Sequence, residues 1–274
     1  MAKKEIAQMN KLKKGEFYGT HYKKSAFENV VLTDTEYTHD TVDWHYHENP
    51  YFTYLLQGTL FESNKKEAYY LIPGSLIFHN WQDAHYNKKP PEFTRGFHIE
   101  LNDSWFLEYD IKTQNFEGSI NLKSPIIKNL IQKVFIESKV DDDCSKLSID
   151  ATLIELFDSV KDIGHKISKR PSWAIKLKEL LFEEDIDYSL KHLSACIGIH
   201  PTHLSREFHR HFGTSLGEYV RLIKLNKAFY LIASNKFSMT EICYKCGFYD
   251  QSHFITNFKR IYNTTPTKLL KEIR

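Results

Sequence analysis

Cysteines and long apolar runs are scarce in this chain of 274 residues. Its four cysteines are too few for the disulfide framework of a small secreted domain, so we expect a reducing, cytoplasmic location. No apolar run approaches the roughly 18–20 residues needed to cross a bilayer. The segment from Met1 to Glu5 does not resemble a signal peptide. The sequence therefore predicts a protein with no membrane partner.

A strong net charge is also missing, since 37 basic and 35 acidic residues leave a formal charge of only +2. The charges are nevertheless segregated along the chain. The segment from Tyr188 to Arg274 holds thirteen basic and five acidic residues, a net charge of +8, which leaves −6 for residues 1–187. A basic segment joined to an acidic one predicts a polyanion-binding module attached to a second unit, with a merely basic surface as the alternative.

Length and patterning favour more than one domain. The length is that of two ordinary domains, and a charged fraction of 26% argues against wholesale disorder. Residues 29–101 contain short β-rich runs separated by turn residues, which is typical of a sandwich or small barrel. The predicted strands cover residues 30–32, 51–56, 59–61, 69–72, 76–78 and 93–101.

After residue 122 the hydrophobic period becomes helical. Apolar residues repeat at helical spacing over 125–136 and over 149–163. These two helices are expected either to form a dimer interface or to pack against their own barrel. Residues 164–172 have the composition of a linker.

Capping residues predict the ends of the helices that follow. N-terminal caps or first turns are expected at Ser189, Pro201, Ser215, Ser238 and Asp250, and C-terminal ends at Gly198, Gly213 and Gly247. In two of the expected caps, Ser215 with Glu218 and Ser238 with Glu241, the spacing predicts a reciprocal capping box.

Two of these segments share one helix–turn–helix plan. In each, a short helix leads through a glycine, Gly198 or Gly247, into a second helix. Glycine permits the left-handed backbone that a tight turn between helices needs. The second helices, 201–212 and 251–262, turn polar side chains outward, as a helix entering a DNA major groove must. Two such units within the +8 segment favour DNA binding over a ligand-free helical bundle.

The helix that connects the two units has a suitable length. The helix expected from Ser215 to Ser234 is about 30 Å long at 1.5 Å per residue. One turn of DNA is roughly 34–36 Å. Two recognition helices held this far apart are expected to enter successive major grooves.

The segment from Ser189 to Arg274 resembles the AraC-type DNA-binding domain. The resemblance rests on SLKHLSACIGIHPTHLSREFHRHFG, SLGEYVRLIKLNKAFYLI and TEICYKCGFYDQSHFITNFKRIYNTTP, and covers roughly the last third of the chain. It implies that base-facing side chains are Thr202, Ser205, Arg206, Gln251, Ser252, Ile255 and Thr256, and that phosphate-binding ones are Arg210, Lys259 and Arg260. Ile255 and Thr256 depart from the family pattern, so the second unit is expected to recognise bases weakly.

Two N-terminal segments, DWHYHENPYFTYLLQG and YYLIPGSLIFHNWQDAHY, resemble the cupin-type sensor that precedes many AraC-type domains. The resemblance brings His45, His47 and His85 to one barrel mouth. Three imidazoles are typical metal ligands, but Tyr51 stands where metal cupins carry a glutamate. The sequence therefore predicts no metal and no cofactor. These four residues are expected to form an effector pocket, with unligated core or rim histidines as the alternative. Further candidate pocket walls are Trp44, Tyr54, Trp81 and His98, although aromatic residues in a small barrel more often belong to its core.

Together the two resemblances imply an α+β multidomain protein. A cupin-like antiparallel β-barrel is expected over residues 1–122, a helical dimerisation or packing segment over 123–163, and a linker over 164–172. An all-α DNA-binding domain, with two helix-turn-helix units joined by a long helix, is expected over 173–274. Cys243 and Cys246 are interpreted as core residues rather than as zinc ligands, because no second pair accompanies them.

The sequence therefore predicts a cytoplasmic, sequence-specific transcription regulator and not an enzyme. Its expected partners are double-stranded DNA, a small-molecule effector, a second copy of the chain in a homodimer, and RNA polymerase. A metal-dependent cupin enzyme with a DNA-binding regulatory tail is the alternative from another class. The third possible function is that of a general nucleoid or scaffold protein, which would bind DNA without sequence preference.

Overall fold

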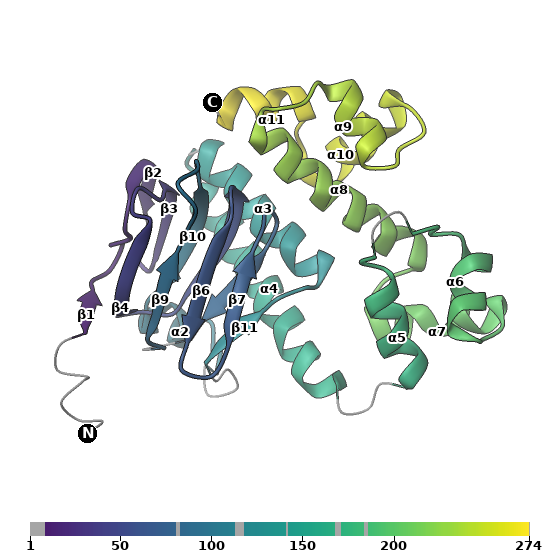
Figure 1. The fold of residues 1–274 in the computed structure, drawn as a ribbon, viewed down its shortest axis with the longest axis horizontal. Coiled ribbons are helices and arrows are strands. Elements are labelled where there is room, and N and C mark those ends of the chain that lie inside the picture. The colour runs from purple at the N-terminus through teal and green to yellow at the C-terminus, as the bar shows by residue number, and fades with distance from the viewer. Residues whose placement is uncertain are drawn as a thin grey trace.

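The structure is a computed structural model that describes residues 9–80, 83–112, 118–140, 142–167, 171–183 and 186–273. Two β-sheets form the N-terminal part and helices form the C-terminal part, as Figure 1 shows. The α+β fold class predicted from the sequence is confirmed. Within the described ranges, no helix combines the length and the apolar character needed to cross a membrane.

The N-terminal part is built from two facing sheets, called the barrel below. Five strands pair in the order β1-β4-β9-β6-β7, and six in the order β11-β8-β5-β10-β3-β2. The strands are β1 Asn10–Leu12, β2 Thr20–Ala26, β3 Val30–Glu36, β4 Thr41–His47, β5 Tyr51–Gln57, β6 Leu60–Asn64, β7 Ala68–Leu71, β8 Leu76–His79, β9 His85–Lys88, β10 Arg95–Leu101 and β11 Ser119–Asn121. Neighbouring strands pair antiparallel, except β1 with β4. All six predicted strands are present.

Strand β5 is buried on both of its faces. Side chains alternate along a strand, so Tyr51 and Thr53 face the space between the sheets, where they line a cavity. Phe52 and Tyr54 face the helices, and the ring of Phe52 lies 5.6 Å from that of Phe157. One strand thus contacts both the barrel interior and the helical layer.

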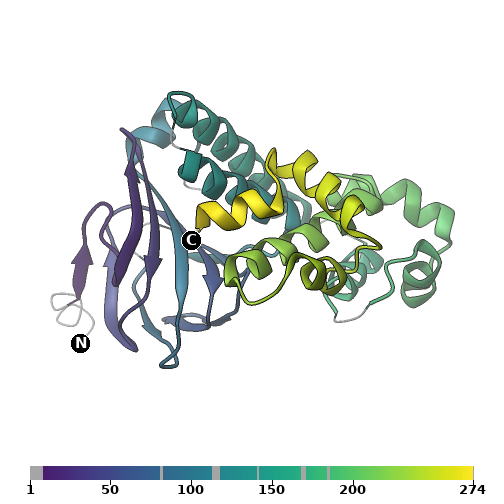
Figure 2. The ribbon, with the colours of Figure 1, turned by 90° about the horizontal axis from the view of Figure 1, so that it is seen from above.

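Two long helices cover the outer face of the six-stranded sheet (Figure 2). They are α3 Pro125–Val140 and α4 Ser145–Ile167, and a short α2 Asp103–Glu108 precedes them. Phe135 of α3 packs against Phe97 of β10 with ring centroids 5.0 Å apart. Of the two expectations for these helices, packing against their own barrel is the one observed. Helix α4 continues through residues 164–167, where a linker was predicted, while residues 168–170 of that linker lie outside the described ranges.

The C-terminal helices begin and end where the capping residues predict. They are α5 Ser172–Leu180, α6 Leu190–Ile197, α7 Pro201–Phe212, α8 Leu216–Ser234, α9 Met239–Lys245, α10 Gln251–Tyr262 and α11 Pro266–Ile273. Gly198 and Gly213 take left-handed backbone at the ends of α6 and α7. The capping box of Ser238 with Glu241 is complete.

The second predicted capping box is only half formed. Ser215 accepts a hydrogen bond from the backbone N–H of Glu218, as predicted. The Glu218 carboxylate, however, pairs with Arg221 and Arg260, which are stronger partners than a backbone N–H because both are charged.

The hydrophobic cores divide inside α8 rather than at the predicted linker. Tyr219 and Val220, in the first turns of α8, belong to a small core formed with α5, α6 and α7. Further along the helix, Leu225, Phe229 and Ile232 belong to the main core, which also contains the six-stranded sheet, α3, α4 and α9 to α11. The second helix-turn-helix unit therefore shares its core with the barrel, and the first unit has its own.

Buried hydrogen bonds join the second unit to the barrel. The amide of Gln132 on α3 donates to the Tyr54 hydroxyl on β5 at 2.6 Å. The same amide's oxygen accepts from the Tyr262 hydroxyl on α10 at 2.5 Å. At the far end of the interface, Arg95 of β10 donates to the carbonyl of Ile273 in α11 at 3.2 Å.

Removal of the Tyr262 hydroxyl tests this connection. Tyr262→Phe leaves the buried amide oxygen of Gln132 without its donor, and such a loss costs about 1–3 kcal/mol. We expect urea unfolding, followed by circular dichroism, to show a free energy of unfolding lower by that amount. Tyr244→Phe is the matched control, because Tyr244 is 63% exposed and its hydroxyl lies at the surface. Equal stability of the two variants would contradict the role assigned to the bond.

Candidate functional site

The ten residues predicted to contact DNA all lie on α7 and α10, and all ten are exposed. They are Thr202, Ser205, Arg206 and Arg210 on α7, and Gln251, Ser252, Ile255, Thr256, Lys259 and Arg260 on α10. The opposite faces of the two helices are fully buried. Leu204 and Phe208 anchor α7, and Phe254 and Phe258 anchor α10. The apolar spacing thus fixes which side chains each recognition helix presents to solvent.

Several of these polar side chains already have partners in the chain. Gln251 donates to the Thr240 hydroxyl at 2.5 Å, across the turn between α9 and α10. Arg260 binds the Glu218 carboxylate at 3.0 Å, so it is tied to the first turn of α8. Arg206 lies 3.3 Å from Glu207, but its guanidinium remains 73% exposed. Arg206 is therefore available to a ligand, whereas Arg260 needs to share or leave its carboxylate.

The second candidate site is the interior of the barrel. The four residues predicted to form a pocket, His45, His47, Tyr51 and His85, are all buried and line one cavity. The cavity measures about 30 Å³, which is room for about one or two water molecules. In this arrangement the cavity has room for an ion or for water.

The histidines of the interior hold defined tautomers. Nδ1 of His45 lies 2.8 Å from the backbone carbonyl of Asp43, and Nδ1 of His85 lies 2.9 Å from that of Asp83. Since a carbonyl only accepts, each Nδ1 carries a proton and each Nε2 keeps its lone pair. Backbone carbonyls fix metal-binding histidines in the same way.

Burial keeps these imidazoles neutral. It lowers the pKa of His85 and of His98 to about 3. The pKa of His47 also falls well below its usual value, first through burial and then through the neighbouring His85. A neutral imidazole is the form that binds metal.

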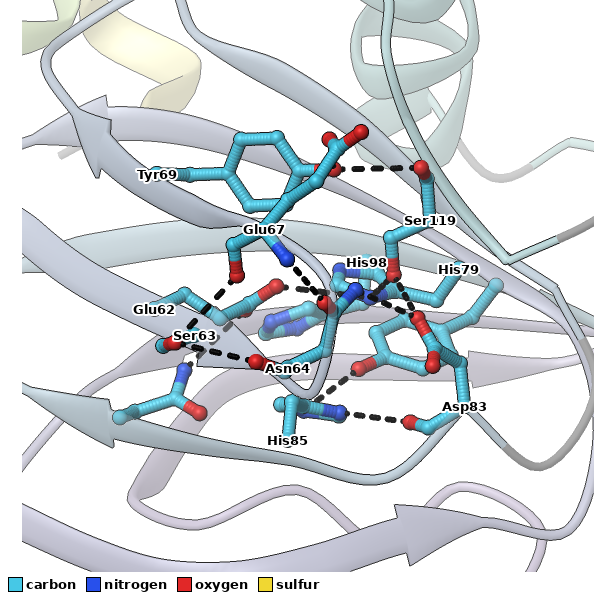
Figure 3. Close-up of polar contacts among 12 residues, drawn as sticks. Glu62, Ser63, Asn64, Glu67, Tyr69, His79, Asp83, His85, His98 and Ser119 are labelled. Atoms are coloured by element: carbon cyan, nitrogen blue, oxygen red, sulfur yellow. Dashed lines mark hydrogen bonds and ion pairs between the residues drawn. The ribbon is translucent and has the colours of Figure 1, made fainter.

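Two buried residues near this cluster were not predicted from the sequence. Glu62 on β6 and His79 on β8 are 2% and 0% exposed. Nδ1 of His79 lies 3.6 Å from Oε1 of Glu62 (Figure 3). Burial raises the pKa of the Glu62 carboxyl to about 8. His79 lies within the second cupin-like segment but was not assigned to the pocket, whereas Glu62 lies in neither segment. Only the alternation of Leu60, Glu62 and Asn64 along β6 indicates that Glu62 points away from Phe61.

Two overlapping groups of residues could hold a metal ion. Ligand atoms of His45, His47 and His85 lie within 4.8 Å of one another, and so do those of Glu62, His79 and His85. The prediction that Tyr51 removes the carboxylate from this region is incomplete, because Glu62 brings one from another strand. The Tyr51 hydroxyl itself lies 3.1 Å from Nε2 of His85.

The remaining candidate pocket walls have different positions. His98 lines the cavity. Tyr54 faces the helices, where it accepts from Gln132, so its assignment to the pocket is wrong. Trp44 packs against Tyr86 with ring centroids 5.1 Å apart, and Trp81 lies outside the described residues. Cys243 and Cys246 are buried free thiols, as expected of core residues.

Comparison with known proteins shows similarity in the C-terminal part of the chain. Residues 193–272 match a family described as a helix-turn-helix domain. The HTH-type transcriptional activator RhaS of Salmonella arizonae is 40% identical over 63 residues, which are 23% of this chain and 23% of that protein. The chain therefore matches about a quarter of the length of this relative.

Two solved structures also resemble the chain. An apo form of ToxT from Vibrio cholerae has a TM-score of 0.43 and 14% identity, covering 90% of this chain and 99% of that one. The C-terminal domain of the response regulator yesN from Fusobacterium nucleatum has a TM-score of 0.33 and 28% identity, covering 35% of this chain and 95% of that one.

Buried neutral histidines make the barrel sensitive to acid. From about pH 6.5 down to about pH 3 the unfolded chain binds more protons than the folded chain at each lowered histidine, so the free energy of unfolding falls as the pH falls. Glu62, with a raised pKa, acts in the opposite direction between its usual value of 4.5 and about 8. Burial also raises the pKa of the Glu100 carboxyl, so the five histidines are set against two carboxyls and outnumber them.

Urea unfolding midpoints at about pH 7 and about pH 5 measure this dependence. We expect a lower midpoint at the lower pH, and a smaller difference in His85→Gln, which has lost one of the five groups. His39→Gln is the control, because His39 is exposed. An unchanged pH dependence in His85→Gln would contradict the burial argument.

Proposed function

Residues 193–272 belong to the AraC-type helix-turn-helix domains, and from this premise we propose that the chain is a sequence-specific DNA-binding transcription regulator. The observation that carries the proposal is the duplicated unit. Two recognition helices, α7 and α10, expose every residue predicted to contact DNA while α8 joins them (Figure 1). The net charge of +8 after residue 187 supplies the attraction to phosphate.

The exposed side chains divide by chemistry. Arg206 is suited to guanine and Gln251 to adenine, because each offers paired hydrogen-bonding groups to a base edge. Arg210 and Lys259, near the C-terminal ends of their helices, are suited to phosphate oxygens. Ile255 offers only an apolar contact, for example to a thymine methyl, and no arginine stands among the base-facing residues of the second unit, so this unit is expected to recognise bases more weakly than the first.

We also propose that the barrel is a cupin-like sensor that controls DNA binding. The support is the shared core, because the second unit packs on α3 and on the barrel through Phe229, Tyr262 and Gln132. A small molecule or ion with different affinities for two arrangements of this interface would shift the population of DNA-binding chains. The proposal includes a cytoplasmic homodimer that acts on RNA polymerase, and it includes no catalytic step.

Selection of binding sites from random DNA tests the proposed function. The full chain is incubated with a random duplex library, and the bound fraction is sequenced over several rounds. We expect a motif with two blocks about one helical turn apart, one for each recognition helix. Enrichment of no motif would show a general nucleoid protein and would overturn the proposal.

Two substitutions then separate base recognition from phosphate binding. Arg206→Ala should weaken binding to the selected site by about 1–3 kcal/mol and relax one base position, whereas Lys259→Ala should weaken all sequences alike. Fluorescence anisotropy with the selected duplex and with single-base variants measures both effects. Lys66→Ala is the charge-matched control, because Lys66 lies between β6 and β7 of the barrel. If Arg206→Ala weakened binding to every sequence equally, this result would contradict the assignment of Arg206 to base recognition.

A further inference from the structure

The barrel interior brings together the ligand atoms of one carboxylate and two imidazoles. Glu62, His79 and His85 come from β6, β8 and β9, and a ligand atom of each lies within 4.8 Å of the other two. All three are buried, with exposed fractions of 2% or less. Figure 3 shows Glu62, His79 and His85 converging between the two sheets.

Each of the three side chains has spare capacity to bind an ion. Nε2 of His79 has no hydrogen-bond partner among the described residues. Nε2 of His85 is unprotonated, since Asp83 holds the proton on Nδ1, and it accepts a hydrogen bond from the Tyr51 hydroxyl at 3.1 Å that a bound ion would replace. Glu62 accepts only a long hydrogen bond, 3.3 Å, from Asn87. A buried carboxylate with a long hydrogen bond and a buried imidazole nitrogen without a partner are costly, and a bound cation would satisfy both.

We propose that the barrel binds one divalent transition-metal ion through Glu62, His79 and His85. Two imidazoles and one carboxylate are a common ligand set for zinc and for ferrous iron, with bonds of about 2.0–2.2 Å in zinc sites. Donors arranged around such an ion lie roughly 3–4 Å apart. The separations in the barrel require only small side-chain movements to reach this range.

Charge favours this group over the three histidines His45, His47 and His85. No lysine or arginine is among the described residues that line the cavity, so the ion itself would be the main positive charge. Three neutral imidazoles leave both charges of the ion uncompensated in a buried site, whereas Glu62 cancels one of them. The carboxylate therefore decides which of the two groups holds the metal.

The site would also join the two sheets. His79 belongs to β8 of the six-stranded sheet, whereas Glu62 and His85 belong to the five-stranded sheet. A metal held by all three is a cross-link between the sheets and stabilises the folded chain, because binding to the folded state alone raises its stability. His45 and His47 lie on one strand of the five-stranded sheet, so an ion on the three histidines would not bridge the sheets.

Zinc titration of the full chain tests the proposal. The chain is freed of metal with a chelator, and zinc binding is measured by competition with a chromogenic chelator, alongside thermal unfolding with and without zinc. We expect one zinc ion per chain and a higher unfolding temperature with zinc. In Glu62→Gln and in His79→Gln, zinc affinity should fall roughly tenfold or more, and the rise in unfolding temperature should be lost.

Two further variants identify the group that holds the ion. Glu67→Gln, at an exposed glutamate next to the same sheet, and His45→Gln should keep zinc affinity within about threefold of the original chain, well below the loss expected of a ligand. A loss in His45→Gln without a loss in Glu62→Gln would place the ion on the three histidines and overturn the assignment. Absence of saturable zinc binding would overturn the site as a whole. Circular dichroism checks the folding of each variant. If Glu62→Gln does not fold, the zinc affinity of His79→Gln alone decides whether this group holds the ion. The inference does not depend on DNA binding, so site selection and zinc titration can fail separately.

Discussion

The packing of α8 is the constraint on which the rest of the structure depends. Its first turns contribute Tyr219 and Val220 to the small core of the first helix-turn-helix unit. Its later turns contribute Phe229 and Ile232 to the core of the barrel and of the second unit. A helix of 19 residues that is buried in two separate cores fixes the distance between the recognition helices. The same helix also fixes the second unit against β5, so the attachment of the barrel and the spacing of the two recognition helices depend on one element.

Strand β5 links the histidine cluster inside the barrel to the helices on its other face. Tyr51 on one face touches His85 inside the barrel, and Tyr54 on the other face is hydrogen-bonded through Gln132 to α10. Protein interiors are closely packed, so a shift of a buried strand displaces neighbours on both of its faces. An ion or ligand that moves the histidine cluster thus acts on a recognition helix through a single strand and one buried amide, without passing through the linker.

Local signals in the sequence predicted the C-terminal helices well. Each helix end there depends on one or two residues, such as Asp250 at the start of α10 or Gly198 at the end of α6, and these act within a single turn of backbone. The strands β2, β4 and β9 were missed because their residues are mostly polar and lack an apolar run. Glu62 and His79 escaped prediction for a different reason: their proximity arises from the pairing of the sheets, which no local pattern encodes. The division of the cores within α8 likewise depends on tertiary packing.

The two helix-turn-helix units differ in the contacts that attach them to the rest of the chain. The first has a small separate core, with α8 as its main connection to the rest of the chain. The second is held by hydrophobic packing and by two buried hydrogen bonds, one from Tyr262 to Gln132 and one from Arg95 to the carbonyl of Ile273. A rearrangement of the barrel interface would therefore move α10 directly, and α7 through α8 and through the contact of Ile126 on α3 with the small core. Because Arg206 on α7 is the better base-recognising residue, the first unit is suited to set sequence preference. The second unit exposes Ile255 and Thr256 and is attached to the barrel. Its position is therefore suited to determine whether both units can bind the DNA at the same time.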